Sequence, residues 1–490
     1  MKKKLTVHEP QTEFLGLIST GNKYAVASRG CFALEGAFLW TLKDRIDRTW
    51  MEGYQRLPSM EEDDDDKKLI NTVPPYLTSR GADTLAAFSA ALMRCGGCGA
   101  KVGARTVSRV LDAVHQRRML KAEALTAVEH ACSIKPKKID HDDAAVVMLP
   151  EKGGGAMIHT IDFFRSFISD PFVFGKIAAV HALSDCHAMG AQAQTALALA
   201  VVPFAAFESI TECTLVDMLS GASDILDDDG CELSGGHTCE GAELALGFAI
   251  NGYVQNPKFL LRKQGGMVGD KMILTKPIGT GALFAADMRA KCPGKFVEEA
   301  IGSMVTSNSS ASQIAMNMNL GGDSSCGCIH ACTDVTGFGL VGHLLEMLVA
   351  NDGNTNLDQI SATLDLGAVP FFKGALEAVS KDIVSSLQRE NTRSRRAIHN
   401  HEEAAKECPE KYRLIFDPQT AGGLLFFVSP DVVDEFVSKL SSDPGTKCAV
   451  IIGELNKYKG EDNIESCDEE NICIVGACSN STSSRIHIKY

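Results

Sequence analysis

Two thiols and one amine lie close together in a glycine-rich segment, residues 94–103, which reads Arg-Cys-Gly-Gly-Cys-Gly-Ala-Lys-Val-Gly. Cys95 and Cys98 offer soft nucleophiles, and Lys101 offers a cation. Glycine gives the backbone unusual freedom and allows close approach to other groups. Apolar residues with helical spacing follow at Val107, Val110, Leu111 and Val114. We therefore predict a loop that carries a nucleophile and a cation, hangs from a packed helix and can close over a ligand.

Three further roles for the cysteine pair stay open at this point. A zinc site needs four ligands, and the nearest further cysteines, Cys326, Cys328 and Cys332, have the wrong spacing. A thioredoxin-like redox motif needs a buried strand before it, whereas residues 84–93 form an alanine-rich helical pattern. Cysteines are also often simply small buried residues.

Length and composition restrict the class of protein. A chain of 490 residues is expected to form two or three domains. A net charge of -14 argues against nucleic acid as the main partner, since phosphate contacts need clustered cations. The 17 cysteines are scattered, so we expect reduced thiols and a cytoplasmic protein. No apolar run reaches about 18 residues and no apolar leader follows Met1, so we expect neither a membrane span nor a signal segment.

The order of patterns predicts two successive α+β domains after an N-terminal segment and a linker. Residues 1–57 form a unit of their own, with strands expected at 14–18 and 24–27 and a helix at 38–51. Residues 58–93 contain an acidic run, two adjacent prolines and a lead-in helix, and form a linker.

The two domains are expected at residues 94–260 and 261–490. In the first we expect strands at 144–149, 156–161, 195–202 and 244–254 and helices at 171–189 and 210–226. In the second we expect strands at 272–275, 422–428, 449–453, 472–475 and 485–489 and a helix at 334–349.

Aspartates recur inside or at the ends of apolar runs, at Asp142, Asp143, Asp162, Asp185 and Asp334. A carboxylate taken out of water without a partner costs several kcal/mol. Each has a structural explanation on its own, such as Asp334 capping the helix expected after it. Together they predict an oxygen-only site of the kind that magnesium prefers.

The chain has no G-x-x-x-x-G-K-[ST] phosphate loop, so an ATP-using enzyme with this sequence would hold phosphates through metal ions on aspartates. Residues 235–238, Gly-Gly-His-Thr, are expected to form a glycine turn whose backbone approaches a nucleotide. Residues 417–423 end in two glycines and are expected to form a structural turn that leads into a strand.

These segments together resemble the selenophosphate synthetase family, also called selenide, water dikinase. The matching segments, in the family's order, are residues 98–101 (Cys-Gly-Ala-Lys), 142–146 (Asp-Asp-Ala-Ala-Val), 160–164 (Thr-Ile-Asp-Phe-Phe), 182–185 (Ala-Leu-Ser-Asp) with 188–190 (Ala-Met-Gly), 235–238, 275–279 (Thr-Lys-Pro-Ile-Gly), 333–339 (Thr-Asp-Val-Thr-Gly-Phe-Gly) and 417–423. Each motif is weak alone, but the ordered set is specific and covers about residues 94–490.

The resemblance implies a fold, a reaction and a set of residues. The fold is that of aminoimidazole ribonucleotide synthetase, an α+β fold of two domains that forms a homodimer through a shared barrel of N-terminal sheets. The reaction is ATP, selenide and water giving selenophosphate, AMP and phosphate, with Mg²⁺ and in addition K⁺ as candidate cations. Cys98 and Lys101 would be catalytic, and Asp143, Asp185 and Asp334 would hold magnesium. Nucleotide contacts would come from Lys101, Asp140, His141, Asp142, Asp162, Asp185, Gly236, His237 and Thr238.

The N-terminal segment resembles the C-terminal tail of FAD-dependent NADH dehydrogenase-like proteins, which precede the synthetase in some fused family members. The likeness rests on residues 21–30, Trp40 and residues 43–47. No G-x-G-x-x-G fingerprint occurs there, so we expect no FAD and interpret the segment as a remnant or a docking piece.

Three rival functions agree less well with the sequence. Another ATP-dependent enzyme of the same fold would have no need of Cys98 in the glycine loop. A regulatory paralogue would have lost Cys98 or Lys101, and neither is lost. A redox module using Cys95 and Cys98 would show a reversible disulfide and bound flavin. The chain departs from the family at Ala100, where a second cysteine is common, and at His181, where asparagine is common.

Overall fold

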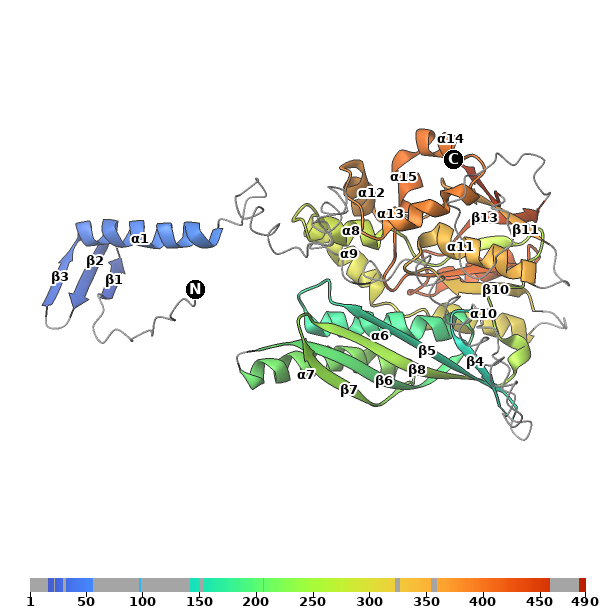
Figure 1. Cartoon of the computed structure of the whole chain (residues 1–490), viewed down its shortest axis with the longest axis horizontal. Coiled ribbons are helices and arrows are strands. Elements are labelled where there is room, and N and C mark those ends of the chain that lie inside the picture. The colour runs from blue at the N-terminus through green and yellow to red at the C-terminus, as the bar shows by residue number, and fades with distance from the viewer. Residues whose placement is uncertain are drawn as a thin grey trace, which may run out of the picture. The chain divides into compact units, whose positions relative to one another are not determined.

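The computed structural model describes residues 16–21, 23–29, 32–55, 97, 142–149, 154–205, 207–321, 327–353, 359–458 and 484–490. The chain divides into two units, residues 1–92 and 93–490, each described by itself. Cys98, Lys101, Asp140, His141, the linker and the strand expected at 472–475 lie outside the described residues. Figure 1 labels the helices and strands.

The N-terminal unit is a three-stranded meander with one helix. Its elements are β1 (Gly16–Gly21), β2 (Tyr24–Arg29), β3 (Phe32–Gly36) and α1 (Ala37–Gln55). Leu39 of the helix packs on Ala25 and Ala27 of the central strand. The two expected strands and the helix are confirmed, and β3 was not predicted.

The second unit begins with a five-stranded sheet in the spatial order β4-β5-β8-β6-β7. Its strands are β4 (Ala145–Met148), β5 (Ala156–Arg165), β6 (Gln192–Pro203), β7 (Glu232–Gly241) and β8 (Ala245–Val254). Helices α6 (Pro171–Ala188) and α7 (Glu208–Asp228) pack together, and α6 also packs on the sheet. Only β6 and β7 pair in parallel; the other neighbours in this sheet are antiparallel.

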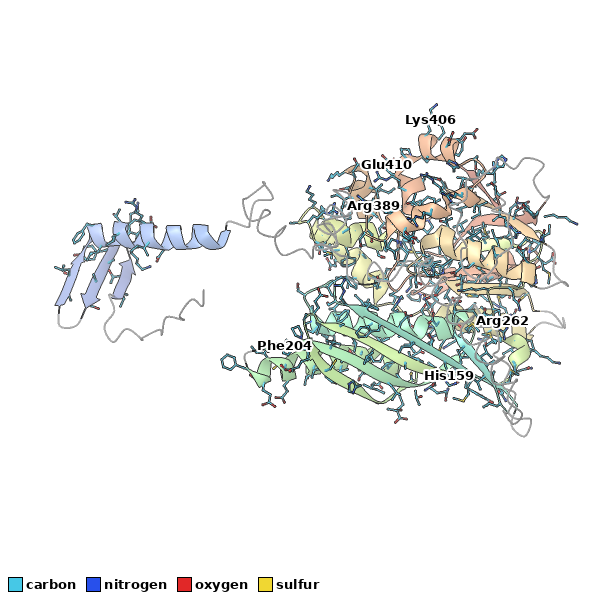
Figure 2. The ribbon with its side chains drawn as sticks, in the orientation of Figure 1. His159, Phe204, Arg262, Arg389, Lys406 and Glu410 are labelled. Atoms are coloured by element: carbon cyan, nitrogen blue, oxygen red, sulfur yellow. The ribbon has the colours of Figure 1, made fainter. Side chains whose placement is uncertain are left out.

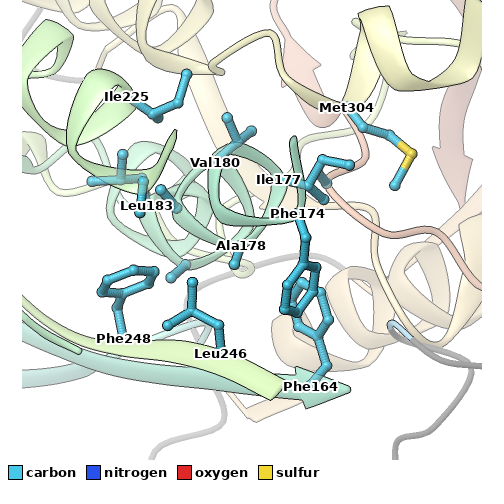
Figure 3. Packing of buried hydrophobic residues seen from close by; sticks show 14 of the residues in the cluster. Phe164, Phe174, Ile177, Ala178, Val180, Leu183, Ile225, Leu246, Phe248 and Met304 are labelled. Carbon is cyan, nitrogen blue, oxygen red and sulfur yellow. The ribbon is translucent and has the colours of Figure 1, made fainter. Parts of the chain in front are cut away.

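Helix α6 has apolar residues on every side and packs both on this sheet and on β10 of the following domain, so it lies at the junction of the two (Figure 1). Asp170 caps it by accepting from two backbone N–H groups of the first turn. Figure 3 shows Leu246 and Phe248 of β8 directed at Ala178 and Leu183 of the helix. Burying a side chain of this size stabilises the fold by about 1.5–3 kcal/mol.

The second domain contains a six-stranded sheet in the order β10-β12-β9-β13-β11-β14. Its strands are β9 (Lys271–Leu274), β10 (Ile329–Asp334), β11 (Ile360–Asp365), β12 (Leu424–Val428), β13 (Val450–Lys457) and β14 (Ile486–Lys489). Its helices are α8 (Thr280–Asp287), α9 (Gly294–Met304), α10 (Ser309–Gly321), α11 (Gly339–Ala350), α12 (Lys373–Ser380), α13 (Gln388–Asn391), α14 (His401–Glu407), α15 (Pro409–Leu414) and α16 (Val433–Ser442).

Two local predictions were wrong. Residues 235–238 are not a turn but part of strand β7, where Gly235 and Gly236 adopt positive φ angles of 147° and 159°. Two adjacent glycines by themselves suggest a turn. Here, pairing with β6 holds them in an extended strand instead. Asp334 is not a helix cap, because it ends β10, and helix α11 begins only at Gly339.

Helices α6 and α7 approach each other through glycine, and this contact can be tested. A Cβ at Gly221 would lie 1.9 Å from the carbonyl oxygen of Phe172, which is too close for any side chain. We expect Gly221→Ala to destabilise the protein by about 1–3 kcal/mol and to lower its unfolding temperature by several degrees. Gly302→Ala on α9 is the control, since a Cβ there meets nothing within 4 Å. Equal unfolding temperatures for the two variants would contradict this packing.

Candidate metal and nucleotide site

Three carboxylates from three elements converge in the second unit. Asp143 precedes β4, Asp185 lies on α6, and Asp334 ends β10. One oxygen from each lies within 4.8 Å of the others. The side chain of Asp143 is 4% exposed, and Asp334 is 2% exposed. Residues far apart in the sequence, and in both domains, therefore form one acidic cluster.

The chemistry of this cluster fits a divalent cation. Oδ2 of Asp143 and Oδ2 of Asp334 are buried and have no hydrogen-bond partner among the described residues. Buried polar atoms are almost always satisfied in folded proteins. Carboxylate oxygens alone, without nitrogen or sulfur, are the donor set of magnesium. Asp143, Asp185 and Asp334 are therefore the residues that would hold a magnesium ion.

The carboxylates disturb one another electrostatically. Burial, together with the nearby Asp162, Asp334 and Asp143, raises the pKa of Asp185 well above its ordinary value. Burial also raises the pKa of Asp143 to about 6; Lys263 lowers it and Asp334 raises it. The hydroxyl of Thr160 on β5 donates a hydrogen bond to Asp185. These charges are costly to keep together without a cation.

Asp162 lies at the edge of the same cluster. It is on β5, two residues after Thr160, and therefore on the same face of the strand. Its Oδ2 lies 3.7 Å from Nε2 of the fully buried His181 on α6. Nδ1 of His181 accepts a hydrogen bond from the N–H of Ala421 at 3.2 Å. The histidine at the departure from the family pattern thus connects Asp162 with the second domain.

Asp142, expected to contact ATP, is engaged with two neighbouring basic residues. Arg262 donates to its Oδ2, and the backbone N–H of Lys263 donates to its Oδ1 at 3.0 Å. Figure 2 labels Arg262 on the segment that follows the sheet of the first domain. The immediate effect of these bonds is to fix the backbone that carries Asp143.

Lys263 binds two buried carboxylates. Its Nζ lies 2.8 Å from Oδ1 of Asp143 and 2.9 Å from Oε2 of Glu346 on α11. Burial opposes its charge, but Asp143 and Glu346 together raise its pKa well above the ordinary value. Burial likewise opposes ionisation of Glu346, yet Lys263 and His343 lower the pKa of Glu346 to about 2. Both groups are ionised at neutral pH.

Residues 417–423 contact both domains, in agreement with a structural role for this turn, since the N–H of Ala421 donates to His181 of α6. Gln419 caps α8 by accepting from the N–H groups of Gly279 and Thr280 at 2.8 and 3.1 Å. Gly97 lies against the same turn, because a Cβ there would meet Oγ1 of Thr420 at 2.6 Å. Gly97, the one described residue of the glycine-rich segment 94–103, therefore lies beside this turn.

Three of the other residues predicted to contact the nucleotide lie away from the acidic cluster. Gly236, His237 and Thr238 lie on β7 at the edge of the sheet, and β8 and β6 separate them from β5, which carries Asp162. Within one copy of the chain they do not join the acidic cluster. Cys98, Lys101, Asp140 and His141 lie outside the described residues.

Sequence reasoning missed several residues that support the cluster. Thr160 could have been found from its position two residues before Asp162. Glu346 could also have been found, because it is a carboxylate inside an apolar helix, the criterion that identified the aspartates. Lys263 gave no sign in the sequence, since it lies far from both of its partners along the chain.

Repulsion within the cluster predicts a stabilising substitution. The pKa of Asp185 in the folded protein lies above its unfolded value of about 3.8, so the folded state binds more protons than the unfolded state. The protein therefore loses stability as the pH rises from about 3.8 towards the folded-state pKa. We expect Asp185→Asn to unfold at a higher temperature than the wild type at pH 8 in EDTA, with a smaller difference at pH 5. Magnesium should stabilise the wild type and not the variant. Asp224→Asn, at an exposed pair with Lys176, is the control. A variant less stable than the wild type in EDTA at pH 8 would contradict the repulsion.

Comparisons with known proteins identify the fold of the second unit. Residues 141–254 match the family described as AIR synthase related protein, N-terminal domain, and residues 267–462 match AIR synthase related protein, C-terminal domain. These matches confirm the predicted α+β fold. None of the helices in the described ranges is both long and apolar enough to cross a membrane.

Two curated relatives share most of their length with this chain. The selenide, water dikinase of Nitratidesulfovibrio vulgaris is 33% identical over 370 residues, which is 74% of this chain and 94% of that protein. The selenide, water dikinase of Bdellovibrio bacteriovorus is 33% identical over 361 residues, 74% of this chain and 93% of that protein. This chain therefore belongs to the selenide, water dikinase family.

Proposed function

We propose that this protein makes selenophosphate from ATP, selenide and water, releasing AMP and phosphate. The observation that carries the proposal is the convergence of Asp143, Asp185 and Asp334 in a chain that has no phosphate loop. The relatives named selenide, water dikinase support the reaction. In the first step the bond between the β- and γ-phosphoryl groups breaks and a selenium–phosphorus bond forms. ADP is then hydrolysed to AMP and phosphate.

Asp143, Asp185 and Asp334 would hold Mg²⁺, which when bound supplies positive charge that offsets the charge of the phosphates. The chain's own groups contact these carboxylates: Thr160 donates a hydrogen bond to Asp185, and Lys263 forms an ion pair with Asp143. Asp162 is proposed to contact the nucleotide from β5, with His181 behind it. Burial keeps these carboxylates fixed, so little reorganisation is needed when phosphate charge enters.

Cys98 and Lys101 are proposed to act on the selenide and the transferred phosphoryl group. Bringing selenide to a phosphate joins two anions, so a cation such as the Lys101 ammonium lowers the repulsion. A thiol that approaches the same point can guide or carry selenium. Gly97 of the same segment lies beside Thr420, which supports a place for the segment near the junction of the domains. Such a segment can exclude water in the first step and admit it in the second.

The same chain is proposed to form a homodimer through the outer face of its first sheet. Ile161 and Phe163 of β5 and Leu197 of β6 point away from α6 and are 64%, 39% and 46% exposed. A continuous apolar surface of this kind marks an interface. Pairing two such faces would also place β7, with Gly236 to Thr238, against a second copy.

Location and organisation complete the proposal. The cysteines that the structure describes are all free, which supports a reducing compartment such as the cytoplasm. The two domains are proposed at residues 94–260 and 261–490, and the N-terminal unit is proposed to be a remnant of a flavoprotein tail or a docking piece.

Phosphorus NMR of the full chain with ATP, magnesium and selenide tests the reaction. We expect a selenophosphate resonance, with AMP and phosphate appearing in equal amounts. Cys98→Ser should still hydrolyse ATP slowly but form little selenophosphate, because the group that guides selenium is lost. Cys213→Ser, at an exposed cysteine on α7, is the control. Wild-type protein that yields ADP and no selenophosphate would refute the reaction, and full activity in Cys98→Ser would remove Cys98 from it.

The dimer is tested by placing charge on the outer sheet face. We expect the Ile161→Glu and Leu197→Glu double variant to sediment as a monomer at concentrations where the wild type is a dimer, because the introduced carboxylates would be buried at the interface. Val216→Glu, at an exposed position on α7, should leave the dimer intact. A double variant that still dimerises would place the interface elsewhere.

A further inference from the structure

Lys263 occupies a fixed position beside the acidic cluster. The carbonyl oxygen of Arg262 accepts a hydrogen bond from the N–H of Cys332 on β10 at 2.9 Å. The N–H of Lys263 itself donates to Asp142 at 3.0 Å. The two contacts fix the peptide unit between Arg262 and Lys263, and the lysine side chain, 9% exposed, lies in the junction of the two domains.

The two oxygens of Asp143 have different surroundings. Oδ1 receives Nζ of Lys263 at 2.8 Å and the hydroxyl of Thr333 at 3.0 Å. Oδ2 is buried and without a partner among the described residues, and the cluster with Asp185 and Asp334 lies beside this carboxylate. Because two donors hold Oδ1, the carboxylate of Asp143 cannot rotate freely. Only Oδ2 is then left to bind a ligand.

A chain of contacts runs from Lys263 to the strand end that carries Asp334. Glu346, bound to Lys263 at 2.9 Å, lies 3.4 Å from Nδ1 of His343 on the same helix. Nε2 of His343 is 3.3 Å from the hydroxyl of Thr336, two residues after Asp334. Asp143 from the first domain is thereby connected to the segment that carries Asp334 in the second.

We propose that Lys263 is a positioning residue for the divalent-cation site: its ammonium, fixed by Glu346, holds Oδ1 of Asp143 so that Oδ2 faces Asp185 and Asp334. The inference rests on the proposed function in one respect only, that these three carboxylates bind a cation. Groups behind a metal ligand commonly change metal affinity ten- to a hundredfold when removed.

A role for Lys263 as a mere counter-ion predicts the opposite change in cation affinity. If Lys263 were only a counter-ion that fills the place of the metal, removing it would leave more negative charge in the cluster and tighten cation binding. If Lys263 positions Asp143, removing it frees the carboxylate to rotate and weakens binding. The sign of the change therefore separates the two roles.

The experiment measures binding of Mn²⁺, added as the only metal to the full chain, by the electron paramagnetic resonance of free Mn²⁺. We expect Lys263→Met, which keeps the length of the side chain without its charge, to bind Mn²⁺ about ten- to a hundredfold more weakly than the wild type. The magnesium concentration for half-maximal activity should rise by a similar factor, with a smaller change in kcat at saturating magnesium. Lys271→Met, at an exposed pair with Glu454, should bind like the wild type.

A second variant keeps the test valid if Lys263→Met fails to fold. Lys263→Met leaves Glu346 buried without its cation, which is strongly destabilising, so the Lys263→Met and Glu346→Gln double variant removes both charges. We expect this double variant to melt cooperatively and still to bind Mn²⁺ weakly. Binding as tight as in the wild type, in either folded variant, would overturn the positioning role. Wild-type protein that binds no Mn²⁺ would instead refute the metal site of the proposed function, and the inference with it.

Discussion

Repulsion between buried carboxylates is the constraint on which the rest of the second unit depends. Asp143, Asp185 and Asp334 present oxygens within 4.8 Å of one another, and Asp162 adds a further charge nearby. The ammonium of Lys263 binds Asp143 from behind, and two buried oxygens of the cluster have no hydrogen-bond partner in the described ranges. Mutual repulsion makes such an arrangement costly by itself, and a bound divalent cation would offset that cost.

Packing at the junction of the two domains fixes the positions of the carboxylates in this cluster. Asp185 lies on a largely buried helix, because the small residues of α6 allow the sheet, α7 and β10 to approach closely. Asp334 needs a strand end directed at that helix, which β10 provides. The turn at residues 417–423 then fixes the two domains through His181, and Gly97 lies beside the same turn. The positions of the carboxylates in the cluster thus depend on packing far from it.

Much of the site could be predicted because buried carboxylates are rare and stand out in apolar runs. The same criterion finds Glu346 when it is applied within helices. Lys263 could not be predicted, since a lysine in a polar segment is usually solvated and its two partners are distant along the chain. The α+β fold followed from alternating patterns and from motif order. Residues 235–238 and the start of α11 were placed wrongly, because tertiary pairing with β6 and the end of β10 override the local meaning of glycine and aspartate.

The most direct test of the metal site is the anomalous scattering of Mn²⁺ in crystals of the full chain grown with a non-hydrolysable ATP analogue. We predict manganese coordinated by Asp143, Asp185 and Asp334, at metal–oxygen distances of about 2.0–2.3 Å, and bridging to phosphate oxygens of the analogue. An ordered analogue whose phosphates are held elsewhere, with no manganese between these three carboxylates, would contradict it.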